Sequence, residues 1–478
     1  MPRPRKLKNV VWPLNPVMMS NTGTTPVTSL RRSEILRRAW PVMLANASVP
    51  LLGLSDTAVI GNTGSLSALG AIAFGAIIFS FVYWGFGFLR MGTTGFTAQA
   101  VGAGDEAEVR TVLWRALLLA VALGLTLIVL QAPISAVSLS LMNGSDSVDV
   151  LTQGYIAIRI WGAPAALALF ALMGCLIGLG HSKTLLLVQV FLNGVNIALD
   201  IWFAGVLGMG VEGIALGTVV AEWSSVGLGL FLVLRILRQR HVDAEAFIPL
   251  PRLRDWVRLR HTLSVNSHIM IRTLLLVFSF AWFVRQSAQF GDDVLAANHI
   301  LLQLISFSAF FLDAYAYVTE ALVGEAAGAN NVQRFDDAVR KSSELALASA
   351  AVLAAIILFG GDYAAQLLSA HEQVRYQVSQ VLPWASLYVL LAVVAFQLDG
   401  IFIGTTRTRE MRNAAMFGTA IFLPLSLLAI LVAGIHGLWL SFVTYVCLRA
   451  IFLLIYLPGL RRALDTASNS IVSPDQSR

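Results

Sequence analysis

The sequence predicts an all-α integral membrane protein whose twelve transmembrane helices form two repeated halves of six. Three observations lead to this prediction: an apolar composition, a one-sided distribution of basic residues and an internal repeat. Of the 478 residues, 57% are hydrophobic and only 13% are charged, with a mean hydropathy of +0.75. Soluble chains carry about 25% charged residues, so most of this surface must face lipid. One span takes roughly 20 apolar residues, so twelve spans account for about half of the chain.

Twelve apolar segments follow one another along the chain, separated by Gly, Pro or clusters of charge. They predict helices at 39–61, 69–97, 112–134, 152–178, 185–206, 212–236, 262–288, 296–325, 342–361, 380–404, 412–433 and 438–459.

The basic residues indicate how these helices cross the membrane. Of the 33 Lys and Arg, 27 lie in or next to the chain ends and the even-numbered loops, whereas only Arg285 and Arg375 lie in or next to odd-numbered loops. Cytoplasmic loops carry the excess of basic residues in membrane proteins. We therefore expect both termini to lie in the cytoplasm.

Three landmarks occur twice in the sequence. Residues 102–105 match 328–331, and Gly174-x3-Gly178 matches Gly400-x3-Gly404, both at an offset of 226 residues; 210–213 matches 434–437 at an offset of 224. Two halves that both begin in the cytoplasm are related by an axis along the membrane normal. The predicted units are a basic tail expected to be disordered (1–38), an amino lobe of helices 1–6 (39–236), a cytosolic linker (237–261), a carboxy lobe of helices 7–12 (262–459) and a second cytosolic tail (460–478).

Signals for other classes of protein are missing from the sequence. Cys175 and Cys447 lie in apolar stretches without a CxxC motif, and the chain has neither an HExxH motif nor a P-loop. Residues 1–38 lack the apolar core and cleavage site of a signal peptide. The net charge of +6 resides mainly in tails and loops. We therefore expect no enzymatic activity, no catalytic residues, no cofactor, no metal site and no nucleic-acid partner.

Two acids of the first half are the strongest candidates for a functional site. Asn193, Asn196 and Asp200 share one helical stripe because of their spacing, and Asp56 lies near the middle of the first helix. Ionisable groups at membrane depth are costly and are functional candidates by default. Two like charges close together in a low dielectric favour retention of a proton, which suits a proton carrier; alternatively, the pair binds another cation. The remaining alternative is a pair of structural carboxyls satisfied by Asn and Thr neighbours.

A second group of charges lies in the second half. Asp313 and Glu320 share a face of the predicted helix 296–325, and Asp399 lies in the helix 380–404. Arg272 on the helix 262–288 can neutralise any of these acids. The sequence leaves structural pairing and a functional role open here.

Three stretches resemble one family of membrane transporters. They are LSDTAVIG at 54–61, GFLRMGTTGFTAQ at 87–99 and LDGIFIGTTRTREMRN at 398–413. These strings are similar to those of multidrug and toxic compound extrusion (MATE) transporters of the DNA-damage-inducible protein F branch, and the resemblance covers about residues 35–460. It implies two six-helix lobes around a central cleft, in a cation-driven antiporter of the bacterial inner membrane that expels small organic, often cationic, compounds.

The resemblance also implies roles for individual residues. The family's amino-lobe cation site maps to Asp56 and Asp200, with hydrogen-bonding partners at Tyr155, Asn196 and Thr218. Pro41 resembles the helix 1 proline implicated in bending. The sodium-driven NorM-like branch has an acid in helix 7, whereas residues 262–288 contain Arg272 and no Asp or Glu, which leaves Asp399 as the matching acid of the carboxy lobe.

Protons are therefore the expected coupling ion, with sodium as the alternative. A lipid-linked-oligosaccharide flippase of the wider superfamily would need several cationic residues for pyrophosphate, and an integral membrane enzyme would need a catalytic cluster. We expect a monomer in the lipid bilayer.

Overall fold

The computed structural model describes residues 30–142, 144–241 and 245–472, which form helices and turns without a strand. Eleven helical segments in this part of the chain are long and apolar enough to cross a membrane, and the last, Thr408–Ser468, has 61 residues. Gly434 interrupts it with a φ of 57°, which glycine adopts readily. This segment therefore contains two spans, and the predicted all-α fold of twelve spans is confirmed.

The first half contains six spans, several of them broken in the middle. Its elements are α1 (Arg32–Ala47), α2 (Val49–Thr63), α3 (Leu66–Trp84), α4 (Phe88–Gly102), α5 (Glu106–Val129), α6 (Gln131–Met142), α7 (Asp146–Arg159), the 3-10 turn η2 (Ile160–Gly162), α8 (Ala163–Gly178), α9 (Ser182–Asp200), the π-helical turn η3 (Ile201–Val206) and α10 (Gly210–Arg240).

The second half has longer, less interrupted helices. They are the short linker helix α11 (Leu250–Leu253), α12 (Trp256–Ser287) with the 3-10 turn η4 (Ala288–Phe290), α13 (Asp292–Gly328), α14 (Val332–Leu368), α15 (Glu372–Gly404) and α16 (Thr408–Val472).

The helices differ from the predicted segments mainly at their ends. Counting apolar residues finds the lipid-facing part of a helix, whereas the helical backbone continues into polar ends. The first helix begins at Arg32 instead of residue 39, and residues 1–29 of the predicted tail lie outside the described residues. The predicted helix 112–134 is divided into α5 and α6, because Pro133 has no N–H to bond the carbonyl of Val129.

The repeat is visible in the backbone. Gly104 and Asn330, offset by 226 residues, have φ values of 68° and 50°, and Gly180 and Thr406, at the same offset, have 73° and 55°. These residues turn the chain after equivalent helices of the two halves. The pseudo-symmetry predicted from the sequence is therefore confirmed.

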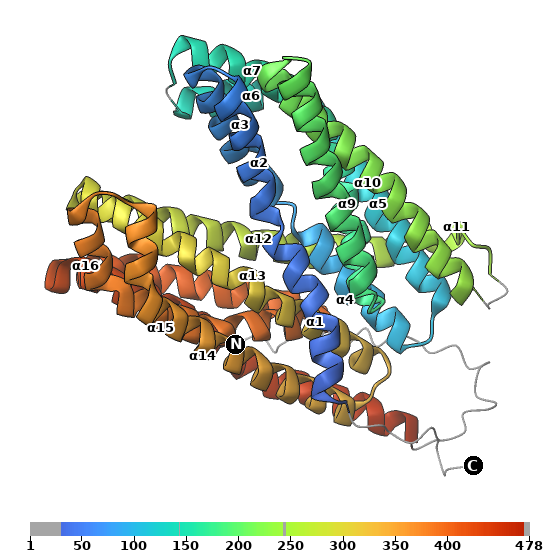
Figure 1. Ribbon diagram of the computed structural model, residues 1–478. Helices are drawn as coiled ribbons and strands as arrows, with labels where there is room; N and C mark the ends of the chain where they lie inside the picture. Colours follow the sequence, from blue (N-terminus) through green and yellow to red (C-terminus); the bar gives the residue numbers. More distant parts are fainter. Residues whose placement is uncertain (1–29, 143, 242–244, 473–478) are drawn as a thin grey trace, which may run out of the picture.

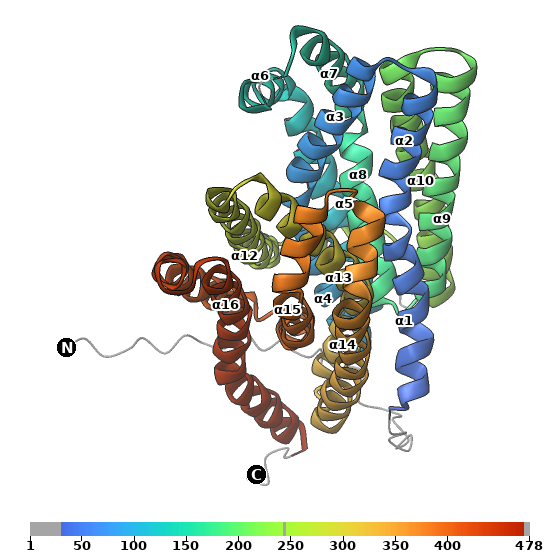
Figure 2. The same cartoon turned by 60° about the vertical axis from the view of Figure 1, so that its left-hand side comes forward.

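The two halves cross where α4 packs against α13. A Cβ on Gly102 would collide with the carbonyl oxygen of Glu325, and one on Gly328 would collide with that of Gln99. Only glycine lets the two backbones approach so closely. Figure 1 shows the helices of the two halves diverging away from this crossing. The turned view in Figure 2 shows α12 to α16 on one side and α2, α9 and α10 on the other.

Each half has its own apolar core. One cluster of buried side chains, which includes Phe283 and Phe442, belongs mainly to the second half. Two others, which include Ile160 and Leu172, belong mainly to the first half. The interrupted helices of the first half, which carry Asp56 and Asp200, therefore pack mainly against other helices of the same half.

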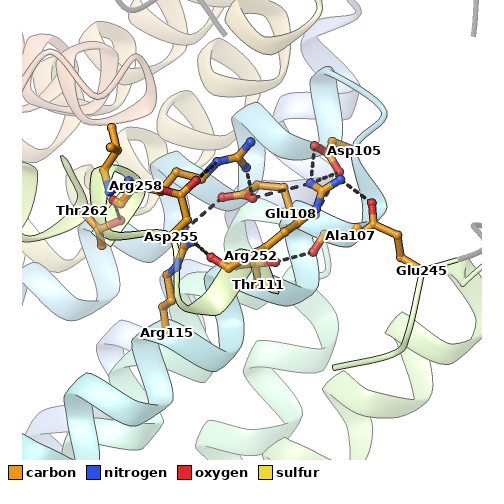
Figure 3. A network of polar contacts seen from close by, with 11 residues as sticks. Asp105, Ala107, Glu108, Thr111, Arg115, Glu245, Arg252, Asp255, Arg258 and Thr262 are labelled. Atoms are coloured by element: carbon orange, nitrogen blue, oxygen red, sulfur yellow. Dashed lines mark hydrogen bonds and ion pairs between the residues drawn. The ribbon is translucent and has the colours of Figure 1, made fainter. Parts of the chain in front are cut away.

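The linker is fastened to the first half by a network of charges (Figure 3). Arg252 of α11 donates hydrogen bonds to both carboxylate oxygens of Asp105, at 2.8 and 2.7 Å, and Arg258 forms an ion pair with Glu108. Glu108 also contacts Arg115 at 3.3 Å. This network lies on the face that carries α11 and the start of α1, which we call the terminal face.

Candidate functional site

The two acids Asp56 and Asp200, here called the acid pair, come together in the first half. Asp200 is fully buried at the end of α9, where the helix passes into η3, and Asp56 of α2 is half-buried. Their carboxyl groups lie close enough to act on each other. Position 217 on α10 must be small, because a Cβ on Gly217 would lie 2.6 Å from Asp200 Oδ1.

Asn196 and Thr218 join the acid pair through hydrogen bonds. Asn196 Nδ2 donates to Thr218 Oγ1 at 3.1 Å and points toward Asp200 Oδ1 at 3.4 Å. Thr218 Oγ1 in turn donates to the carbonyl oxygen of Ile214 at 2.9 Å. The amide group of Asn196 therefore links α9 to α10 beside the acids.

Tyr155 of α7 completes the group of five residues that the sequence singled out. It is 4% exposed and packs edge-to-face against Phe79, with ring centroids 6.0 Å apart. A Cβ on Gly75 would lie 2.5 Å from its ring, so α3 and α7 are in close contact here. The ring is near enough to Asp56 and Asp200 to interact with both electrostatically.

Three oxygens of this group are buried without a hydrogen-bond donor. They are Asp56 Oδ1, Asp200 Oδ2 and Asn196 Oδ1. Burying an acceptor that has no donor is costly, so a proton or a small cation bound among these oxygens would relieve the cost. The arrangement can therefore hold and release a positive charge.

A buried ion pair beside the acid pair was not predicted from the sequence. Arg159 binds Glu222 through two hydrogen bonds, Nη1 to Oε2 at 2.9 Å and Nη2 to Oε1 at 2.6 Å. The signal that could have found it is the spacing: Arg159 lies four residues after Tyr155, and Glu222 lies four residues after Thr218. Residues four apart share one helical face, so both charges face the same group.

Asn193, on the predicted polar stripe, serves a different purpose. Its Nδ2 donates to Ser48 Oγ at 2.7 Å and to the Ser48 carbonyl oxygen at 3.1 Å, where α1 passes into α2. Pro50 follows in the first turn of α2. Pro41 lies buried inside α1, seven residues before this junction, so its bending role stays a prediction while the interruption itself occurs at Ser48.

Two buried acids of the second half, Asp399 and Glu320, are paired with arginines, and one of these arginines, Arg90, belongs to the first half. Arg272 and Arg449 both bind Asp399 Oδ2, the latter at 2.8 Å, and Glu320 Oε2 lies 3.1 Å from Nη1 of Arg90. All three arginines are less than 9% exposed, although Arg90 and Arg449 lie near predicted span ends, where long side chains often extend to the interface. Asp313 lies near Arg90 and Arg272. Paired acids of this kind are poor sites for an additional cation.

The second half has no second copy of the acid pair. At the repeat offset of 226 residues, Asp56 and Asp200 correspond to Trp282 and Ser426, and Trp282 Nε1 donates to Ser426 Oγ at 2.9 Å. The contact between equivalent helices is retained, but its chemistry is neutral. The charge-binding arrangement therefore belongs to the first half.

Comparison with known proteins places the chain in a family. The MatE family model matches residues 41–202 and 269–428, one segment in each half. The chain therefore belongs to the MatE family. As a MatE protein it is 36% identical over 415 residues to DNA damage-inducible protein F of Escherichia coli K12, covering 87% of this chain and 89% of that protein.

More distant MatE proteins share its fold. A probable multidrug resistance protein NorM of Thermotoga maritima is 23% identical over 386 residues, covering 79% of this chain and 81% of that protein. The crystal structure of a MATE protein in the bent conformation superposes with a TM-score of 0.81 at 21% identity, covering 92% of this chain and 97% of that one. An outward-facing multidrug resistance MATE transporter of the MOP superfamily gives a TM-score of 0.79 at 19% identity, covering 91% and 96%. At these identities the likeness establishes the fold.

Proposed function

We propose that this MatE protein is a secondary active antiporter of the bacterial inner membrane that exports small organic compounds in exchange for protons. Its substrates are amphipathic and often cationic, both termini lie in the cytoplasm, and it works as a monomer without a cofactor or catalytic residues. The observation that carries the proposal is the group of three donorless oxygens on Asp56, Asp200 and Asn196.

The acid pair gives this antiporter a coupling mechanism. A proton bound between Asp56 and Asp200 neutralises one charge and supplies a donor to a buried oxygen. Substrate and proton must favour different conformations, because a ligand with equal affinity for both shifts neither. Asp56 lies on α2, beyond the interruption at Ser48, so its distance from Asp200 can respond to a movement of α2.

The flippase alternative finds less support. The pyrophosphate of a lipid-linked sugar requires several cations that no carboxylate has already neutralised. The four arginines within the predicted spans each contact a carboxylate: Arg90 pairs with Glu320, Arg159 with Glu222, and Arg272 and Arg449 with Asp399.

The experiment that tests the proposal uses purified protein in lipid vesicles loaded with a fluorescent organic cation. An imposed proton gradient should drive efflux without sodium, and Asp200→Asn should reduce this efflux more than tenfold while the protein still inserts. Asp362→Asn, which alters an exposed acid of α14, serves as the matched control. Efflux that follows a sodium gradient and ignores the proton gradient would refute proton coupling.

A further inference from the structure

The ion pair between Arg159 and Glu222 lies beside the acid pair without belonging to it. Arg159 is 7% exposed and Glu222 is 6% exposed, and both oxygens of Glu222 accept from Arg159. Gly162 makes room for this pair, because a Cβ there would collide with Glu222 Oε2 and lie 2.7 Å from Arg159 Nη1. The fold thus reserves space for a buried guanidinium next to the acids.

The guanidinium of Arg159 is surrounded on its other sides by weak partners. Its Nη1 lies 3.4 Å from the hydroxyl oxygen of Tyr83, and its Cζ lies 5.1 Å from the centre of the Phe79 ring and 5.5 Å from that of Tyr83. Arg159 is also close enough to Asp56 to act on it electrostatically. Two carboxylates, those of Glu222 and Asp56, therefore lie near the Arg159 side chain, which binds the carboxylate of Glu222.

The local backbone supports this placement. The helix is interrupted directly after Arg159 by η2, and Trp223, the neighbour of Glu222, donates its indole N–H to the Trp161 carbonyl oxygen at 3.2 Å. Adjacent residues of α10 therefore hold both the side chain of Arg159 and the break that follows it.

We infer that Arg159 is a built-in counter-charge of the coupling site. It rests on Glu222 while the acid pair holds a proton, and it is shared with Asp56 once that proton has left. This inference rests on the proposed proton antiport and adds a positioning residue to it. Sharing Arg159 offsets the cost of two buried carboxylates, and so sets the pH range in which the site gives up its proton.

The other ionisable groups around Asp56 fit this role. Asp200 of α9 and two residues of α7, Tyr155 and Arg159, lie near Asp56. Tyr83 of α3 and Glu222 of α10 lie near Arg159. The charges of α1 lie in its first two turns, at the other end of the span. Within the described residues around Asp56, Arg159 is therefore the group that can supply a positive charge.

Three variants separate a counter-charge from a purely structural ion pair. Arg159→Gln with Glu222→Gln, here called the Gln pair, removes both charges together, so no buried charge is left unpaired. Arg159→Glu with Glu222→Arg, here called the swapped pair, restores an ion pair between the same two helices but places a carboxylate on the side of Asp56. Arg159→Lys keeps the positive charge in place.

Proton-gradient-driven efflux is measured in vesicles as a function of internal pH, with insertion and monodispersity as checks. We expect the Gln pair to move the pH midpoint upward by about one unit. Of the two charges removed, that of Arg159 acts on Asp56, and losing a nearby opposite charge favours the protonated acid. The swapped pair should insert but lose gradient-driven efflux, and Arg159→Lys should keep the wild-type midpoint. A Gln pair with the wild-type midpoint, or a swapped pair with wild-type efflux, would overturn the inference. If the Gln pair does not insert, the swapped pair decides.

The response of the wild-type protein in the same experiment distinguishes a failure of the proposed function from a failure of this inference. If wild-type protein ignored the proton gradient, proton antiport itself would be refuted. If the wild type responded and the Gln pair showed no shift, only the role of Arg159 would fail.

Discussion

Arg90 of α4, in the first half, forms an ion pair with Glu320 of α13, in the second half, with 3.1 Å between Nη1 and Oε2. The guanidinium also lies over the ring of Tyr317, 3.7 Å from its centre. Both charged side chains are buried, at 8% and 1% exposure. Breaking one partner of such a pair leaves an uncompensated charge and costs about 3–5 kcal/mol.

Removing one partner should therefore loosen the contact between the halves. We expect Arg90→Gln to widen the distance distribution between spin labels at positions 183 and 409, which lie in the first turns of α9 and α16, equivalent helices of the two halves. Double electron–electron resonance measures this distance in a background without Cys175 and Cys447. The double variant Arg90→Gln with Glu320→Gln leaves no unpaired charge and should widen it less. Identical distributions in the wild type and Arg90→Gln would refute a role for the pair in holding the two halves together.

The linker network predicts a second outcome. Partial burial alone would lower the pKa of Arg252, but its hydrogen bonds with Glu245 and Asp105 raise it above the ordinary value, so the side chain stays charged at any physiological pH. We expect Arg252→Ala to increase deuterium uptake in the peptide 245–255 severalfold, and high salt to act in the same direction by screening. Arg260→Ala, an exposed arginine of α12, is the control and should leave uptake unchanged.

The sequence predicted the spans better than their interruptions. Apolar composition and the repeat of glycine motifs were sufficient for twelve helices in two related halves, because each span must satisfy its own backbone in lipid. The break at Ser48 and the split at Pro133 depend on particular hydrogen bonds, such as the one from Asn193 to Ser48. Hydropathy carries no information about such bonds.

The sequence likewise predicted the acids of the candidate site but not which arginines pair with the other acids. Asp56 and Asp200 stand out in sequence because charge is rare at membrane depth, and the structure places them together. Which arginine faces which acid depends on helix rotation and tilt. The spacing places Arg159 and Glu222 on the faces that carry Tyr155 and Thr218, but only the packed helices show that they bind each other, and the same holds for the two arginines on Asp399.

Close helix packing in the second half gives a third prediction. A Cβ on Gly404 would collide with the backbone carbonyl oxygen of Glu320, whereas one on Gly194 would meet nothing within 4 Å. Gly404→Ala should lower the thermal unfolding midpoint in detergent by several degrees, since overpacking costs about 1–3 kcal/mol. Gly194→Ala is the matched control and should stabilise the helix slightly or leave it unchanged. Equal midpoints for the two variants would contradict the close approach of α13 and α15.

The distribution of basic residues gives a fourth prediction, about orientation. Positions 146, 292 and 371 lie at turns on the face opposite the terminal face, and position 245 lies in the linker. Cysteines at the first three should react with an impermeant maleimide in intact cells, and a cysteine at 245 only after permeabilisation. Labelling of both sets from the same side would exclude the proposed topology.

The last prediction concerns the coupling between proton and substrate. If the acid pair holds a proton in one conformation and substrate is bound in another, linkage makes their antagonism reciprocal. Acidification should weaken the equilibrium affinity for an organic cation, and adding that cation to detergent-solubilised protein in weak buffer should release protons. Asp200→Asn keeps the shape of the side chain but removes its titratable group, so the proton release should disappear, whereas Asp362→Asn should release protons as the wild type does. Proton release that persists in both Asp56→Asn and Asp200→Asn would place the coupling outside the acid pair, because the proton would then come from another group.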